Sequence, residues 1–221
     1  LGAGVQSVEG LRQLREQGWY IVGCDMDPVA PGLIWCDDTI TASVYHADQC
    51  VPAVEQYHND VRPIDGVMCL AVDAPHVVAR VAAALGLPGL PIEIADLSVD
   101  KVAMKACFKA YGVPTPDFRK ITSYSDLRAF AENRRDGIVV KPTDSRGSKG
   151  VLWVRELDTL GHAYEYALDW SPSNQVMVEE FTPGPQLSTE SVVVGGVAHT
   201  IGISDRNYEF LEAYAPHIVE N

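Results

Sequence analysis

Residues 137–150 read GIVVKPTDSRGSKG and predict a β-hairpin with a polar tip. The β-branched residues 138–140 are typical of a buried strand. Lys141 ends this strand, because Pro142 cannot donate a hydrogen bond to a ladder. Strand character resumes at residues 151–154, after an octet that contains two glycines and small polar side chains. The second half of the chain must therefore contain an antiparallel pair of strands.

The polar octet suggests an anion-binding loop. Its backbone N–H groups and hydroxyls could close over phosphate oxygens, and Lys141 would supply a point charge beside them. An ordinary solvated hairpin turn with a lysine on its flank is the alternative, and the residues of the loop do not decide between the two. The loop is not a P-loop, because no G-x-x-x-x-G-K-[ST] run leads from a strand into a helix.

The first half of the chain alternates strands with helices. We expect helices from residue 8 to Gly18, over 47–57 and over 75–85, and strands over 19–24, 39–44 and 64–70. This alternation predicts a parallel, doubly wound sheet. The run GLPGLP at residues 86–91 closes the unit with glycine and proline.

The turn Gly2-x-Gly4-x-x-Ser7 could be part of a dinucleotide fingerprint, with Asp25 at the distance where an acid would hold a ribose. However, Ser7 stands at the position where that fingerprint has its third glycine. A lone G-x-G turn also occurs wherever a strand feeds closely into a helix. We therefore favour a structural role for this turn.

The second half has a different pattern. We expect a helix capped by Ser98 up to residue 111, a strand over 118–121, a helix capped by Ser123, the hairpin, and a helix over 157–168. A buried strand over 175–178 and a hairpin of strands over 187–194 and 197–203 follow. From about residue 113 onward the pattern is therefore α+β.

Composition limits the classes of function. The net charge of −13 argues against a nucleic-acid surface, because no basic stripe exists to displace counterions. No apolar run approaches the roughly 20 residues of a membrane-spanning helix. The five cysteines include no C-x-x-C pair, which fits reduced thiols in the cytoplasm. Because the chain opens without methionine and stops at Asn221, we expect both ends to be truncated. Whether a targeting segment has been lost with them is left open.

Several motifs, taken in order, resemble the ATP-grasp superfamily of ligases. They are Asp100-Lys101-x-x-Met104-Lys105, the run GVPTP at 112–116, Val139-Val140-Lys141-Pro142 with its hairpin, and Val178-Glu179-Glu180-Phe181-x-x-Gly184. The first half, with its GAG turn and Asp25-Met26-Asp27-Pro28, is similar to the domain that precedes this fold in biotin carboxylase, phosphoribosylaminoimidazole carboxylases and carbamoyl-phosphate synthetases. The resemblance implies an α/β protein with a Rossmann-like parallel sheet over 1–92. Over 93–221 it implies α+β ATP-grasp lobes, incomplete at the C-terminus.

The resemblance also implies roles for individual residues. Lys101 and Lys141 would contact ATP phosphates, and the backbone of Ser145, Gly147, Ser148 and Gly150 would cover the β- and γ-phosphates. The Glu180 carbonyl and the Thr182 N–H would pair with the adenine edge, next to Phe181, with Glu179 beside the exocyclic amine. Many relatives carry Gly-Pro-Glu where this chain has Gly184-Pro185-Gln186, so ribose contact would pass through the neutral amide of Gln186. Glu190 and Arg206 would face the substrate, with Lys141 and Arg206 as the catalytic pair.

The implied activity is an ATP-dependent carboxylate ligase that works through an acyl phosphate, joins a small carboxylate to an amine or similar nucleophile, and uses Mg²⁺. No Glu-x-Asn-type pair stands on a strand after Ile203, so we expect the metal ligands beyond Asn221 and no metal-dependent ligation by residues 1–221 alone. A non-catalytic ATP-binding module and an NAD-dependent dehydrogenase built on the first half are the alternatives. We expect no nucleic-acid or membrane partner, and a homodimer is left open.

Overall fold

The computed structural model describes residues 1–206 and residue 217. The chain divides into two compact units, Leu1–Asp100 and Lys101–Asn221. The five cysteines all lie in the described part of the chain and are free thiols. No helix among the described residues is long and apolar enough to cross a membrane.

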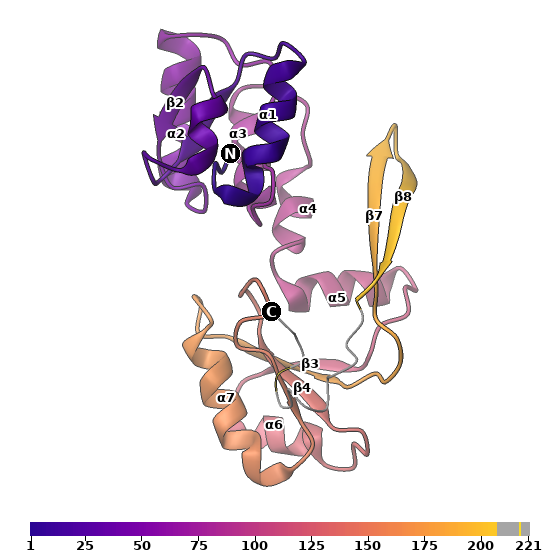
Figure 1. Cartoon of the computed structure of the whole chain (residues 1–221). Coiled ribbons are helices and arrows are strands. Elements are labelled where there is room, and N and C mark those ends of the chain that lie inside the picture. Colours follow the sequence, from indigo (N-terminus) through magenta and orange to yellow (C-terminus); the bar gives the residue numbers. More distant parts are fainter. Residues whose placement is uncertain (207–216, 218–221) are drawn as a thin grey trace. The chain divides into compact units, whose positions relative to one another are not determined.

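Unit 1 contains helices and a small parallel sheet (Figure 1). Its elements are the 3₁₀ helix η1 (Val5–Ser7), α1 (Val8–Glu16), β1 (Val22–Asp25), the 3₁₀ helix η2 (Pro31–Trp35), β2 (Asp38–Thr41), α2 (Ala47–Asp60), α3 (Pro75–Ala84) and α4 (Ile92–Leu97).

The sheet of unit 1 consists of β1 and β2, which pair in parallel from Val22 opposite Asp38 to Asp25 opposite Thr41. Buried side chains of β1, α2 and α3 form the main core beside it, among them Cys24, Val54 and Val77. The parallel pairing confirms the α/β class predicted for this half, since η2 separates the two strands in the sequence and α-helices precede and follow them.

Two predictions for unit 1 are wrong. Residues 64–70 do not form a strand, and Met68 within them is 52% exposed. A strand is defined by its ladder, and this apolar segment pairs with neither β1 nor β2. Ser98 also does not cap the next helix: it ends α4, where its hydroxyl donates to the carbonyl of Ala95 at 2.6 Å.

Unit 2 is built around an antiparallel sheet. Its elements are α5 (Lys101–Ala110), β3 (Phe118–Ile121), α6 (Tyr124–Ala131), β4 (Ile138–Pro142), β5 (Leu152–Val154), the 3₁₀ helix η3 (Leu157–Thr159), α7 (Leu160–Asp169), β6 (Val176–Glu180), β7 (Leu187–Val194) and β8 (Val197–Asp205). As predicted, the Ser123 hydroxyl caps α6 by accepting from the Asp126 N–H at 3.2 Å.

The four-stranded sheet has the order β3-β6-β4-β5. Helices α6 and α7 lie on one side of it and α5 on the other (Figure 1). Ile138 and Val140 of β4, with Val176 and Val178 of β6, join the core that these two helices cover. Because side chains alternate along a strand, the intervening residues of β4 and β6 point to the face of α5.

Strands β7 and β8 form a separate two-stranded antiparallel sheet, as the sequence predicts. Their register runs from Leu187 opposite Asp205 to Val194 opposite Val197, with an irregularity between Glu190 and Ser191. The hairpin extends away from the four-stranded sheet of unit 2 (Figure 1).

Candidate functional site

Lys141 and Glu179 meet on the face of the sheet that α6 and α7 leave uncovered. Glu179 of β6 lies opposite Val139 of β4, and Lys141 is two residues further along β4. Alternation along both strands therefore brings their side chains to the same face. The Lys141 Nζ donates to the Glu179 Oε1.

A second lysine reaches the same carboxylate from α5. The Lys105 Nζ lies 2.6 Å from the Glu179 Oε2 and 6.0 Å from the centre of the Phe118 ring. The side chains of Lys105, Lys141 and Glu179 are only 13%, 15% and 12% exposed. We call these three residues the lysine cluster. It places two cations and one anion in a poorly hydrated site, so its charge balance favours a further anion.

The pKa values in this cluster follow from burial and charge. Burial lowers the pKa of Lys141, and the attraction of Glu179 raises it without fully compensating, so the value stays below the usual one. Burial raises the pKa of Glu179, but the charge of Lys141 and the hydrogen bonds from both lysines outweigh burial and hold it below its usual value. Glu179 is therefore ionised at neutral pH.

The base of the predicted phosphate loop is firmly held. Asp144 accepts hydrogen bonds from the Ser171 hydroxyl at 2.7 Å and the Ser173 N–H at 2.9 Å. Gly150 at the other end is buried with φ of 76°, and an added Cβ there would lie 2.6 Å from the Pro142 Cγ and 2.7 Å from the Trp170 Cβ. Only glycine fits this position without displacement of its neighbours.

The tip of the loop is open. Gly147 and Ser148 are exposed and adopt consecutive left-handed conformations, with φ of 59° and 56°. Lys149 is exposed, with its Nζ 5.2 Å from the centre of the Trp170 ring. The loop, which begins two residues after Lys141, thus joins a fixed base to an accessible polar tip at residues 147–149.

Lys101 binds this loop. Its backbone N–H donates to the carbonyl of Thr143 at 3.0 Å, and its Nζ donates to the carbonyl of Ser145 at 2.6 Å. The first residue of α5 is thereby attached to the loop by both its main chain and its side chain. The phosphate contact implied for Lys101 stays a prediction.

The segment after β6 continues the ladder briefly. The Glu180 N–H donates to the Asp117 carbonyl at 2.9 Å, and the Glu180 carboxylate lies 3.4 Å from the Arg134 guanidinium. The Phe181 N–H reaches the Gly137 carbonyl at 3.4 Å. Within residues 1–206 and 217, the N–H of Thr182 has no hydrogen-bond partner. A backbone donor is therefore available just past the end of the strand.

Residues 99–211, just over half of the chain, match the family model described as the phosphoribosylglycinamide synthetase ATP-grasp (A) domain. The matched range contains the lysine cluster, the loop and the segment after β6. The chain belongs to this ATP-grasp family.

Relatives and solved structures agree with this family. The chain is 34% identical over 140 residues to a D-alanine–D-alanine ligase of Gloeobacter violaceus, a match that covers 60% of this chain and 45% of that protein. An L-amino acid ligase from Bacillus licheniformis aligns with a TM-score of 0.77 at 20% identity, over 99% of this chain and 51% of that one. The biotin carboxylase domain of a Hydrogenobacter thermophilus 2-oxoglutarate carboxylase aligns with a TM-score of 0.71 at 18% identity, over 93% and 49% of the two chains.

These structural likenesses concern the ATP-grasp fold. The chain spans about half the length of the relatives that it matches.

A cavity of about 430 Å³ lies next to the segment after β6 of the ATP-grasp unit. Phe181 in its wall stacks on Trp153, with ring centres 4.1 Å apart and planes 14° from parallel. The Arg155 guanidinium lies 4.5 Å from the centre of the Trp153 ring. Thr182 and Gln186 also line this cavity. Sequence reasoning missed Trp153 and Arg155, although an indole on the strand that leaves the loop and a guanidinium directly after that strand are visible in the sequence.

The base of the β7–β8 hairpin brings two predicted residues together. The Arg206 N–H donates to the Gln186 carbonyl at 2.9 Å. Glu190 lies farther along β7, opposite Gly202, at the irregularity of the hairpin. The structure therefore places Gln186 and Arg206 side by side and Glu190 apart from them along the strand.

Metal ligands of the ATP-grasp unit do not gather in the described part of the chain. Residues 1–206 and 217 contain no cluster of three or more His, Cys, Asp or Glu side chains suited to a metal ion. Glu209, Glu212 and Glu220 lie outside the described residues.

The Gly2 turn of unit 1 has a structural role, as we favoured. An added Cβ at Gly2 would lie 2.2 Å from the Val72 Cγ2. The Asp25 carboxylate accepts hydrogen bonds from the N–H groups of Ala3 at 2.7 Å and Asp27 at 3.0 Å. This acid therefore stabilises the turn itself.

Proposed function

We propose that this chain is the nucleotide-binding part of an ATP-dependent ligase that joins a carboxylate to an amine. The observation that carries the proposal is the lysine cluster beside the open loop. Two buried lysines held by one carboxylate offer net positive charge where a polyphosphate can replace water, and family membership supports ATP as the source of that polyphosphate.

In this proposal the protein acts by position and charge. Lys141 and Lys105 neutralise charge on the phosphates, Glu179 keeps both ammonium groups in place, and the backbone of Ser145, Gly147, Ser148 and Gly150 closes over the β- and γ-phosphates. Such preorganised charge stabilises a phosphoryl group during its transfer without any covalent residue. Mg²⁺, when bound with ATP, would neutralise further phosphate charge.

The reaction proceeds in two steps. A carboxylate oxygen of the substrate attacks the γ-phosphorus, the bond from that phosphorus to the β–γ bridging oxygen breaks, and ADP leaves. The amine nitrogen then attacks the acyl carbon of the acyl phosphate, inorganic phosphate leaves, and the amine loses a proton. Arg206 would meet a carboxylate or phosphate during these steps.

The adenine would bind at the segment after β6. The carbonyl of Glu180 and the N–H of Thr182 present one acceptor and one donor, which matches the edge of adenine. The N–H of Thr182, which has no hydrogen-bond partner among residues 1–206 and 217, supports this placement. Gln186, which lines the adjoining cavity, would contact the ribose with one accepted and one donated hydrogen bond.

Lys141→Ala tests the proposal directly. We expect its ATP affinity to fall at least tenfold, measured by calorimetric titration, while circular dichroism stays unchanged, because Lys105 still neutralises Glu179. Lys120→Ala is the matched control, since Lys120 is an exposed lysine of β3. If Lys141→Ala binds ATP as tightly as the unchanged protein does, the assignment of Lys141 to the phosphate site is wrong.

Turnover distinguishes a ligase from a non-catalytic ATP-binding module. Phosphate release is measured in a longer protein that carries this chain, with Mg²⁺, ATP and pools of carboxylates and amines, beginning with amino acids because of the D-alanine–D-alanine ligase relative. A ligase releases phosphate only when both substrates are present. ATP binding with no release for any pool would favour the non-catalytic module.

A further inference from the structure

Unit 1 buries two cysteine thiols in contact with each other, a feature that the proposed function does not use. The sulfur of Cys24, in β1, lies 3.9 Å from the sulfur of Cys50, in α2. The two residues are only 2% and 0% exposed. All five cysteines lie in the described part of the chain, and no other two of them bring their sulfur atoms into contact there. We call Cys24 and Cys50 the thiol pair.

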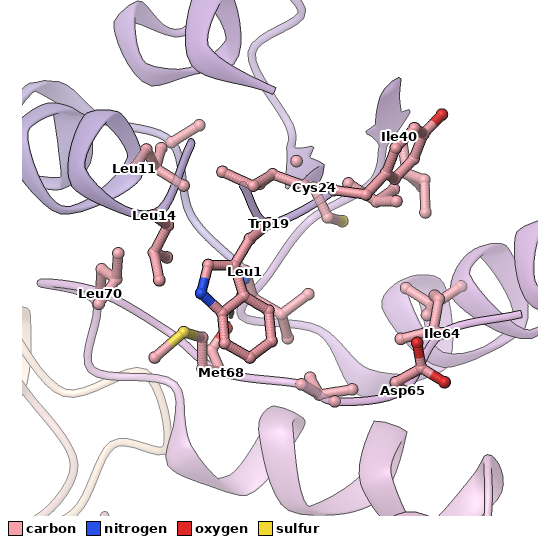
Figure 2. A pocket seen from close by; sticks show the side chains of 18 of the residues that line it. Leu1, Leu11, Leu14, Trp19, Cys24, Ile40, Ile64, Asp65, Met68 and Leu70 are labelled. Carbon is pink, nitrogen blue, oxygen red and sulfur yellow. Dashed lines mark hydrogen bonds between the residues drawn. The ribbon is translucent and has the colours of Figure 1, made fainter. Parts of the chain in front are cut away.

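The surroundings of the thiol pair are largely apolar. Both cysteines belong to the main core of unit 1, together with Val54 of α2. Figure 2 shows Cys24 near Ile40, in the wall of a cavity of about 480 Å³. The Cys24 thiol also lies 3.8 Å from the carbonyl oxygen of Ala42. The sulfur atoms must approach each other by about 1.9 Å to bond, since a disulfide is about 2.0 Å long.

Helix α2 can supply that movement, because it contains a proline next to the thiol pair. Pro52 has no N–H, so the carbonyl of Asp48, one turn before it, receives no helical hydrogen bond from it. The N-cap residue, His46, also makes no side-chain capping bond. Cys50 lies between Asp48 and Pro52, in the part of α2 with the weakest hydrogen bonding. Local opening of this turn costs less than global unfolding, and it admits a molecule as small as hydrogen peroxide.

The contact also makes the two thiols unequal. The hydrogen bond from the Cys24 thiol lowers the pKa of Cys50, although burial opposes this change. The same hydrogen bond raises the pKa of Cys24, and burial raises it further. Because the thiolate is the reactive form of cysteine, Cys50 is the nucleophile of the pair and Cys24 its hydrogen-bond donor.

We propose that Cys24 and Cys50 form a reversible disulfide within folded unit 1 when the protein meets hydrogen peroxide. The Cys50 thiolate attacks one oxygen of the peroxide, the O–O bond breaks, hydroxide leaves, and Cys50 becomes a sulfenic acid. The Cys24 sulfur then attacks the Cys50 sulfur and gives up its proton, the S–O bond breaks, and water leaves. In total, two thiols are oxidised and one peroxide is reduced, giving one disulfide and two water molecules. A small thiol in excess returns the pair to its reduced form.

The disulfide would stabilise unit 1 by joining β1 to α2. The two cysteines are 26 residues apart in the sequence, and a crosslink over a loop of this length restricts the unfolded chain. We therefore expect the unfolding temperature of unit 1 to rise by about 5 °C or more after oxidation, and to return to its first value after reduction with dithiothreitol. A lower unfolding temperature after oxidation would mean that the crosslink does not fit the fold and would overturn the proposal.

The direct test treats the folded 221-residue chain with hydrogen peroxide and maps its peptides by mass spectrometry without reduction. We expect the peptides of Cys24 and Cys50 to be joined, with the loss of two hydrogen atoms. Met26 is 68% exposed and serves as an internal control, because its gain of an oxygen atom reports that peroxide has acted on the protein. Oxidised Met26 together with free thiols at Cys24 and Cys50 would overturn the proposal.

Two variants separate this pair from the other cysteines. In Cys50→Ala we expect no crosslink at Cys24 and no rise of the unfolding temperature with peroxide. Cys36→Ala is the matched control, since Cys36 also belongs to unit 1 but does not contact the pair, and it should form the crosslink as the unchanged protein does. Crosslinks that involve other cysteines, or that form only after unfolding in urea, would overturn the proposal. If Cys50→Ala does not fold, the peptide map of the unchanged protein decides alone.

Discussion

Glu179 is the residue on which the candidate site depends most. It neutralises part of the charge of Lys141 from β4 and Lys105 from α5, and all three side chains are largely buried. The two lysines lie 36 residues apart in the sequence. Removing one partner of a buried ion pair is costly because it leaves an uncompensated charge. Without Glu179, Lys105 and Lys141 would repel each other in a poorly hydrated site. The carboxylate therefore positions both lysines, whatever anion they bind.

Glu179 should make the stability of unit 2 dependent on pH. Its pKa in the folded protein lies below the usual value of 4.5, so its contribution is complete above pH 4.5 and is lost as pH falls through the folded value. We expect the free energy of unfolding to fall less between pH 5 and pH 3 in Glu179→Gln than in the unchanged protein. Urea unfolding at both pH values measures this. An identical fall in the two proteins would contradict the role of Glu179.

Among the elements, the loop between β4 and β5 separates fixed from accessible parts most clearly. Asp144 and Gly150 hold its two ends, whereas Gly147 and Ser148 adopt left-handed conformations at an exposed tip. A closing loop requires both properties, because its ends must stay in register with the sheet while its tip adapts to a ligand.

Two glycine substitutions test this difference. Gly147→Ala imposes a left-handed conformation on alanine in open space, and we expect it to destabilise unit 2 by about 1 kcal/mol. Gly150→Ala adds overlap with Pro142 and Trp170, and we expect about 3 kcal/mol. Urea unfolding of the two variants measures both values. Equal losses of unfolding free energy in the two variants would mean that the base of the loop accommodates an added side chain as easily as its tip does.

At the scale of the whole molecule, the chain consists of two units with separate cores. The lysine cluster and the loop belong entirely to unit 2. We therefore expect ATP to stabilise unit 2, by about 2.7 kcal/mol at a concentration 100 times the dissociation constant, and to leave unit 1 unchanged.

Hydrogen exchange followed by mass spectrometry of peptide fragments measures this prediction. With ATP and Mg²⁺, amides of residues 143–150 should exchange more slowly, because we expect this loop to be mobile without nucleotide. Peptides from residues 1–100 serve as the internal control. Equal exchange of the loop with and without nucleotide would argue against a covering role, and protection confined to unit 1 would place the nucleotide elsewhere.

Local pattern was sufficient wherever a structure depends on neighbours in the chain. The hairpin around residues 138–154, the Ser123 cap, the parallel β1–β2 pair and the motifs of the ATP-grasp family could all be read from the sequence. Turns, caps and amphipathic periods are short-range effects that the sequence displays directly.

Contacts between distant segments could not be read in that way. Lys105 reaches Glu179 only because α5 packs on the uncovered face of the sheet, and residues 138–140 of β4 are apolar on both faces, so their alternation does not show which face is uncovered. Residues 64–70 have the composition of a strand but lack a ladder, since a strand forms only beside a partner. Packing thus decided which charges met and which apolar segment stayed unpaired.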